Sequence, residues 1–81
     1  MNSIKEYDLV ALTKDISAIH KQTQTPILLR RGQVGTVIMD FEQQAFLIDF
    51  ANSEGITYAM ETVDKKYLIP LLYQPSSVLA S

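Results

Sequence analysis

The sequence predicts an all-β domain, because short runs of strand-forming residues alternate with turn signals and no long helical pattern interrupts them. Three of these runs alternate with a period of two, which places successive side chains on opposite faces of a sheet. The 81 residues, 47% of them hydrophobic, suffice for one small domain with a single core.

The first predicted strand is YDLVALT, residues 7–13, and the long segment that follows it is predicted to be a loop. This segment, residues 14–31, has a polar centre, HKQTQTP, whose threonines and Pro26 disfavour a helix. A single helical turn at residues 16–20 is the alternative to an irregular loop there. The apolar residues expected to anchor the loop to the core are Ile16, Ile19, Ile27 and Leu28.

Three successive strands should form a meander: VGTVIMDF at 34–41, AFLIDFA at 45–51 and ITYAMETV at 56–63. In the first of them, strict alternation predicts Val37, Met39 and Phe41 on one face. The second and third are joined by NSEG, a hairpin signal that ends in Gly55, which adopts positive φ without steric cost.

The last elements are a short helical turn and a brief strand. VDKKY, residues 63–67, resembles one helical turn, with Asp64 placed to favour its start. LIPLL, residues 68–72, reads as a closing strand that tolerates Pro70 at an edge. We therefore expect the domain to span residues 1–72 and residues 73–81 to form a disordered tail.

Five short strands in so small a chain cannot build two sheets with separate cores, and a flat sheet would leave one face and both edges open. Curling into a small, partly open barrel solves both problems. The order of the elements predicts a five-stranded SH3-like barrel with a long loop after the first strand and one short helical turn before the last.

The stretches EYDLVALTKDI, RRGQVGTVI, AFLIDFANSEG and YLIPL resemble, in order and spacing, the domain of unknown function 4926 family, a family of small prokaryotic domains. The resemblance covers residues 4 to 71, and its most specific element is the GxxGTV block followed by an (I/V)(D/E)F strand. The segment HKQTQTP departs from the pattern, because it lengthens the loop before Gly32. The resemblance implies an SH3-like fold and no assigned enzymatic activity.

The block RRGQVGTV raises two alternatives, phosphate binding and RNA binding. A phosphate loop needs its glycines before a helix N-terminus, and strand formers follow here instead. KOW-like RNA-binding modules share such a block, but they carry surplus Lys and Arg, whereas this chain has seven basic and nine acidic residues. We therefore interpret Gly32 as a turn residue and Gly35 as a bulge or a close backbone approach.

The sequence contains few residues that could form a catalytic, cofactor-binding or metal-binding site. The chain has no cysteine, and its single histidine, His20, has neither a carboxylate nor a second histidine at ligand spacing and is expected to be exposed. Asp40, Asp49 and Glu61 could line up on the outer face of the meander, where carboxylates stay ionised and inert unless paired. We predict no catalytic, cofactor-binding or metal-binding residue.

Four tyrosines suggest a protein-docking surface, although the chain has no tryptophan for a proline-peptide groove. The charged N-terminus and the absence of a long apolar run predict a cytoplasmic protein that contacts neither membrane nor, with a net charge of −2, nucleic acid.

The sequence therefore predicts a non-enzymatic module that docks a protein partner through the loop at residues 16–31. The residues expected to contact the partner are His20, Lys21, Gln22, Arg30 and Arg31. The alternatives are an antitoxin or immunity-type partner of a toxin, in which a small acidic domain blocks a basic surface, and a KOW-like RNA-binding module.

Overall fold

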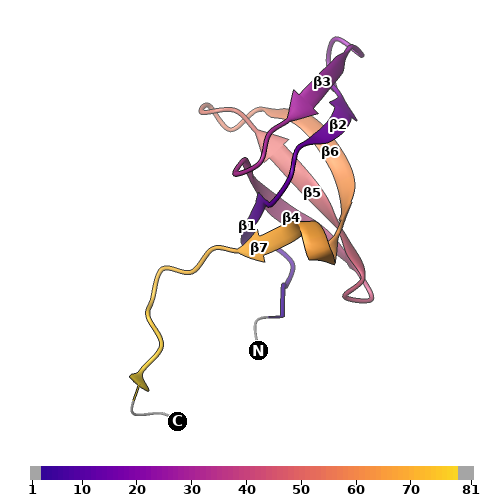
Figure 1. The fold of residues 1–81 in the computed structure, drawn as a ribbon. Coiled ribbons are helices and arrows are strands. Elements are labelled where there is room, and N and C mark those ends of the chain that lie inside the picture. The colour runs from indigo at the N-terminus through magenta and orange to yellow at the C-terminus, as the bar shows by residue number, and fades with distance from the viewer. Residues whose placement is uncertain (1–2, 79–81) are drawn as a thin grey trace.

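The computed structural model describes residues 3–78, and nearly all regular structure in them is β-strand (Figure 1). The elements are β1 (Leu9–Leu12), β2 (Ile16–Ile19), β3 (Pro26–Leu29), β4 (Val34–Phe41), β5 (Ala45–Ala51), β6 (Thr57–Asp64), the 3-10 turn η1 (Lys65–Tyr67) and β7 (Leu68–Pro70). The predicted all-β class and the short helical turn before the last strand are confirmed.

The strands form two antiparallel sheets, one of five strands in the order β6-β5-β4-β1-β7 and one of two strands, β2 and β3. The five predicted strands make up the larger sheet. The prediction of five strands and a long loop was wrong, because residues 16–29 form a β-hairpin instead. ISAI and PILL are each four residues long and pair in register, so that only the polar residues between them form a turn.

A register shift in β4 changes which of its residues face the core. Val37 pairs with Ile48, but Met39 pairs with Leu47, so Ile38 is an extra residue in the manner of a β-bulge. Beyond the bulge the faces exchange, and Asp40 lies opposite Phe46. The prediction that Val37, Met39 and Phe41 share a face was therefore wrong: Val37 is buried, and the other two are exposed.

The hairpin closes one side of the hydrophobic core. Phe46, Ile48 and Phe50 of β5 are fully buried, and the hairpin contributes Ala18 and Leu29 to the same cluster. Burial of each large side chain contributes about 1.5–3 kcal/mol, so the hairpin is an integral part of the fold.

The chain leaves the sheet directly after β7. The amide of Leu71 still donates to the carbonyl of Leu9, at 3.0 Å, and the following residues up to Val78 extend away from the body (Figure 1). Residues 79–81 of the predicted tail lie outside the described residues, as do residues 1–2 of the predicted domain. Nothing in residues 3–78 forms a helix of the length and apolar character needed to cross a membrane.

Candidate functional site

The tip of the hairpin, residues 20–25, is a turn closed by its own hydrogen bonds. The amide of His20 donates to the carbonyl of Thr25 at 2.8 Å, and the amide of Gln24 donates to the carbonyl of His20 at the same distance. The hydroxyls of Thr23 and Thr25 lie 2.7 Å apart. These bonds give the polar stretch HKQTQT a defined shape.

His20 turns its ring towards the larger sheet. Its Nδ1 accepts the amides of Gln22 and Thr23 at 3.2 and 3.3 Å, and its ring stacks on Tyr58 of β6 with the centroids 6.2 Å apart. The side chain is half-buried. The prediction of an exposed histidine was therefore wrong, because the tip folds back against Tyr58.

Tyr58 joins β6 to both ends of the hairpin. Its carbonyl accepts the amide of Lys21 at 2.7 Å, and its hydroxyl accepts a hydrogen bond from Nε2 of Gln33, which follows the hairpin. Nε2 of Gln22 adds a bond to the carbonyl of Thr57 at 3.1 Å. Sequence reasoning missed Gln33, because nothing in a single polar residue after a turn indicates such a partner.

Glu61 spans the gap between β2 and β6. Its Oε2 accepts the amide of Ile19 at 3.3 Å, and its strand position opposite Ile48 places it on the core side of the sheet. In a regular sheet, a backbone carbonyl of the neighbouring strand would accept the amide of Ile19. Here the carboxylate of Glu61 accepts it.

Asp40, Asp49 and Glu61 do not line up on one outer face of the meander. Asp49, on the outer face, accepts the hydroxyl of Thr57 at 2.7 Å, and Asp40 accepts the amide and the side-chain nitrogen of Gln43. Asp40 and Asp49 therefore bind different partners, and Glu61 lies on the core side of the sheet. These three carboxylates do not form a pair for acid–base chemistry.

The two faces of the hairpin differ in exposure. The register places Ile16, Ala18, Ile27 and Leu29 on the core side and Ser17, Ile19, Pro26 and Leu28 on the outer side. Ile19 is 48% exposed and Leu28 is 54% exposed. Of the four predicted anchors, Ile16 and Ile27 pack on the core, whereas Ile19 and Leu28 form an outward apolar surface.

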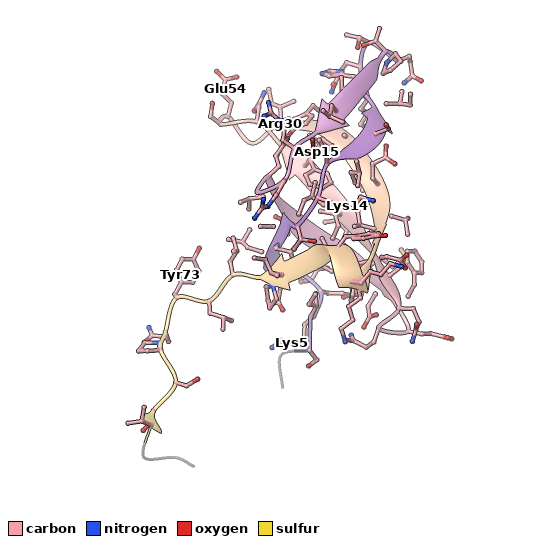
Figure 2. All side chains as sticks on the ribbon, viewed as in Figure 1. Lys5, Lys14, Asp15, Arg30, Glu54 and Tyr73 are labelled. Carbon is pink, nitrogen blue, oxygen red and sulfur yellow. The ribbon has the colours of Figure 1, made fainter. Side chains whose placement is uncertain are left out.

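Arg30 and Arg31 follow β3 at the base of the hairpin, and both have exposed side chains; Arg30 is labelled in Figure 2. The amide of Arg30 donates to Oε1 of Gln33, and the amide of Arg31 donates to Oδ1 of Asp15, both at 2.7 Å. The length of β2 and β3 separates these arginines from His20, Lys21 and Gln22 at the tip. The structure therefore places the five expected contact residues at opposite ends of one hairpin.

The three glycines have different surroundings. Gly32 adopts φ +90° in the turn before β4, and Gly55 adopts φ +81° in the β5–β6 turn, conformations that favour glycine. Gly35 lies within β4, where an added Cβ would lie 2.4 Å from Cγ2 of Ile48 and 3.0 Å from the carbonyl oxygen of Asp49. A strand, and no helix, follows Gly32 and Gly35, so this block does not have phosphate-loop geometry.

A family model described as a domain of unknown function (DUF4926) matches residues 6–70. The chain belongs to the DUF4926 family. The matched region contains every strand from β1 to β7, so the hairpin lies within the DUF4926 domain. Comparisons with curated proteins and with solved structures find no significant match.

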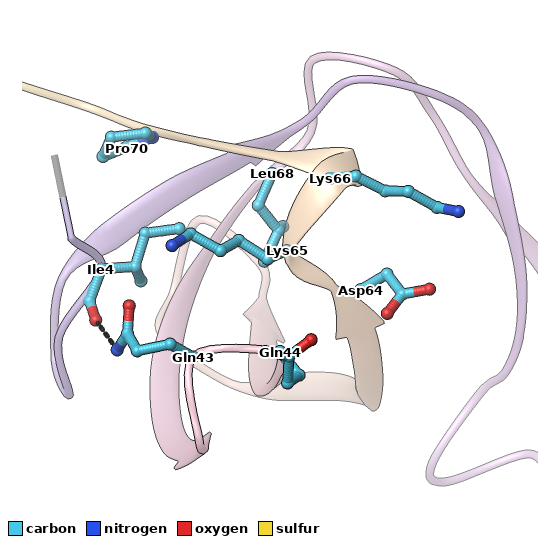
Figure 3. Close-up of a pocket in the computed structure, with 8 residues that line it drawn as sticks. All are labelled: Ile4, Gln43, Gln44, Asp64, Lys65, Lys66, Leu68 and Pro70. Atoms are coloured by element: carbon cyan, nitrogen blue, oxygen red, sulfur yellow. Dashed lines mark hydrogen bonds between the residues drawn. The ribbon is translucent and has the colours of Figure 1, made fainter. Parts of the chain in front are cut away.

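This DUF4926 domain also has an open hollow of about 750 Å³ beside β7, lined by Ile4, Gln43, Gln44, Asp64, Lys65, Lys66, Leu68 and Pro70 (Figure 3). The side-chain nitrogen of Gln43 donates to the carbonyl of Ile4 at 2.8 Å. Lys65 extends towards Ile4 and Gln43, whereas Lys66 and Asp64 point away (Figure 3). Neither here nor elsewhere in residues 3–78 do three potential metal ligands gather.

Proposed function

We propose that this DUF4926 domain is a non-enzymatic protein-interaction module that docks a partner on the outer face of the β2–β3 hairpin. The observation that supports it best is the pair of exposed side chains, Ile19 and Leu28, on adjacent hairpin strands. Exposed apolar side chains that cluster on one surface are typical of interaction sites, and interface centres lack charged residues.

The hairpin is held firmly enough to present this surface without a large ordering cost. One face packs on the core through Ala18 and Leu29, and the tip is bonded to Tyr58. A binding surface that is already ordered loses less conformational entropy on association, which favours affinity.

Each part of the hairpin has a role in this proposal. Ile19, Pro26 and Leu28 form the apolar centre, and Lys21, Gln22, Arg30 and Arg31 form a polar rim. His20 acts as a positioning residue through its contact with Tyr58.

We propose further that the two sheets together represent a partly open SH3-like barrel in which the hairpin takes the place of the long loop. The β4–β5–β6 meander, the 3-10 turn before β7 and the position of β1 between β4 and β7 support this relation. The amide of Lys21 bonds to the carbonyl of Tyr58 and so links the hairpin to the β6 edge. We propose a cytoplasmic location, with which the lack of cysteine agrees.

A pair of matched substitutions tests the docking surface. Leu28→Ser and Ile56→Ser each remove one exposed aliphatic side chain. Leu28 is 54% exposed and Ile56 is 53% exposed, but only Leu28 lies on the hairpin. We expect both variants to keep their stability to within about 0.5 kcal/mol, because exposed side chains contribute little burial.

The comparison uses both variants and the wild-type protein as baits in native extract, with quantitative mass spectrometry as the measurement. A partner retained by the wild type and by Ile56→Ser and lost by Leu28→Ser supports the proposal. Equal retention by all three baits would place the docking surface elsewhere.

A further inference from the structure

The hairpin is the basic part of an acidic protein. Residues 14–33 contain four of the seven basic residues and one of the nine acidic residues, a net charge of +3, whereas the rest of the chain carries −5. Such a separation of charge favours a partner of opposite sign at the hairpin and repels it elsewhere.

The acidic residue of this segment is already engaged at the base of the hairpin. Oδ1 of Asp15 accepts the amide of Arg31 at 2.7 Å. The hydrogen bonds that Arg30 and Arg31 make to Gln33 and Asp15 use their backbone amides, and both side chains are exposed, so their charges remain available to a partner. The ammonium of Lys14 lies over the ring of Tyr67, 4.4 Å from its centroid, and so belongs to a different surface.

Two of the remaining cations frame the apolar surface. The ammonium of Lys21, in the turn at the tip, lies 4.0 Å from Sδ of the exposed Met60 of β6, and the exposed Arg30 follows β3 at the base. The four register pairs of β2 and β3 and the His20–Thr25 pair lie between these ends, so the separation is up to about 20 Å at about 3.3 Å per residue. An extended segment of about six or seven residues spans that distance.

We infer that the hairpin binds an acidic segment of a protein partner, with apolar side chains at its centre and carboxylates towards both ends. This inference rests on the docking function proposed above. The apolar side chains would cover Ile19 and Leu28, and the carboxylates would pair with Lys21 and with Arg30 or Arg31. Charge-assisted pairs at the rim set orientation and association rate, while the apolar centre provides burial.

The segment docks on the face of the hairpin and does not extend its edge. In the described part of the chain, β3 pairs only with β2, so its other side is an edge. Pro26 lies in β3 and has no amide hydrogen, which weakens the edge as a template for an added strand.

Single-stranded RNA fits this surface less well than an acidic peptide. Base stacking needs exposed aromatic platforms, and the outer face offers Ser17, Ile19, Pro26 and Leu28. The ring of Tyr58, beside the hairpin tip, is stacked on the ring of His20.

Selection from a random peptide library displayed on phage, with the full-length protein as target, tests the inference. We expect enriched peptides to carry Asp or Glu on both sides of Leu, Ile, Val or Phe. The best synthetic peptide, measured by fluorescence anisotropy, should lose about tenfold in affinity when NaCl rises from about 50 to about 500 mM.

Charge reversal locates the binding site. Arg30→Glu should weaken the same peptide about tenfold or more, whereas Lys66→Glu, an equal reversal at an exposed residue outside the hairpin, should leave its affinity within about twofold. A circular dichroism melt of each variant verifies that the fold is retained.

The outcomes separate the two proposals. Peptides that need Leu28 but show no acidic preference would overturn the acidic-segment inference and leave the docking site in place. Acidic peptides insensitive to Leu28→Ser and Arg30→Glu would overturn both. Absence of enrichment, or submicromolar binding of a generic RNA that Arg30→Glu abolishes, would also overturn the inference.

Discussion

The ring of His20 stacks on the ring of Tyr58, with 6.2 Å between their centroids and 27° between their planes. This contact fixes the tip of the β2–β3 hairpin against β6, a strand much later in the chain. The amide of Lys21 strengthens it through a 2.7 Å bond to the carbonyl of Tyr58. The orientation of the proposed docking surface therefore depends on a residue that need not itself touch the partner.

Removal of the histidine ring tests this anchor. His20→Ala loses the stacking and the Nδ1 acceptor for two amides, so we expect destabilisation of about 1–2 kcal/mol by urea unfolding. Lys21→Ala is the control, because Lys21 anchors the tip through its backbone amide. An equal loss of stability in both variants would contradict the role of the ring.

The close packing at Gly35 gives a second prediction. Gly35→Ala places a Cβ against Cγ2 of Ile48 and near the carbonyl oxygen of Asp49, and should cost about 2–4 kcal/mol of unfolding free energy. In Gly32→Ala the new Cβ meets no atom within 4 Å, and only the φ of +90° is strained, at about 1–2 kcal/mol. Chemical denaturation gives the unfolding free energy of both variants. A loss in Gly35→Ala no larger than the loss in Gly32→Ala would contradict the close packing at Gly35.

The Glu61 carboxylate should protect the hairpin strand beside it. Glu61→Leu removes the acceptor of the Ile19 amide, and Glu61→Gln keeps an oxygen in its place. Amide hydrogen exchange followed by NMR should show faster exchange at Ile19 in the Leu variant than in the Gln variant, because an unpaired amide opens more readily. Identical exchange rates in the two variants would show that the bond does not hold β2 to β6.

Sequence patterns predicted the five strands of the larger sheet because each combines strand-forming residues with clear turn signals. They failed at the hairpin, since ISAI and PILL are short and a polar stretch between them resembles a loop. Pairing between such strands is a tertiary property that local propensity does not encode.

Two further features depended on three-dimensional packing. The bulge at Ile38 transfers Met39 and Phe41 to the exposed face, although regular strand alternation would place them beside Val37. Of the candidate contact residues, Arg30 and Arg31 could be proposed from the sequence, because they are a basic pair beside the predicted loop. The outward positions of Ile19 and Leu28 follow only from the hairpin register.

Site-specific photo-cross-linking tests the central claim most directly. A benzophenone amino acid replaces Leu28 in one full-length variant and Ile56, which is equally exposed, in another, and each is irradiated in native extract. We predict a discrete cross-linked protein from position 28 and none from position 56. The same protein cross-linked from position 56 and not from position 28 would contradict a docking surface on the hairpin.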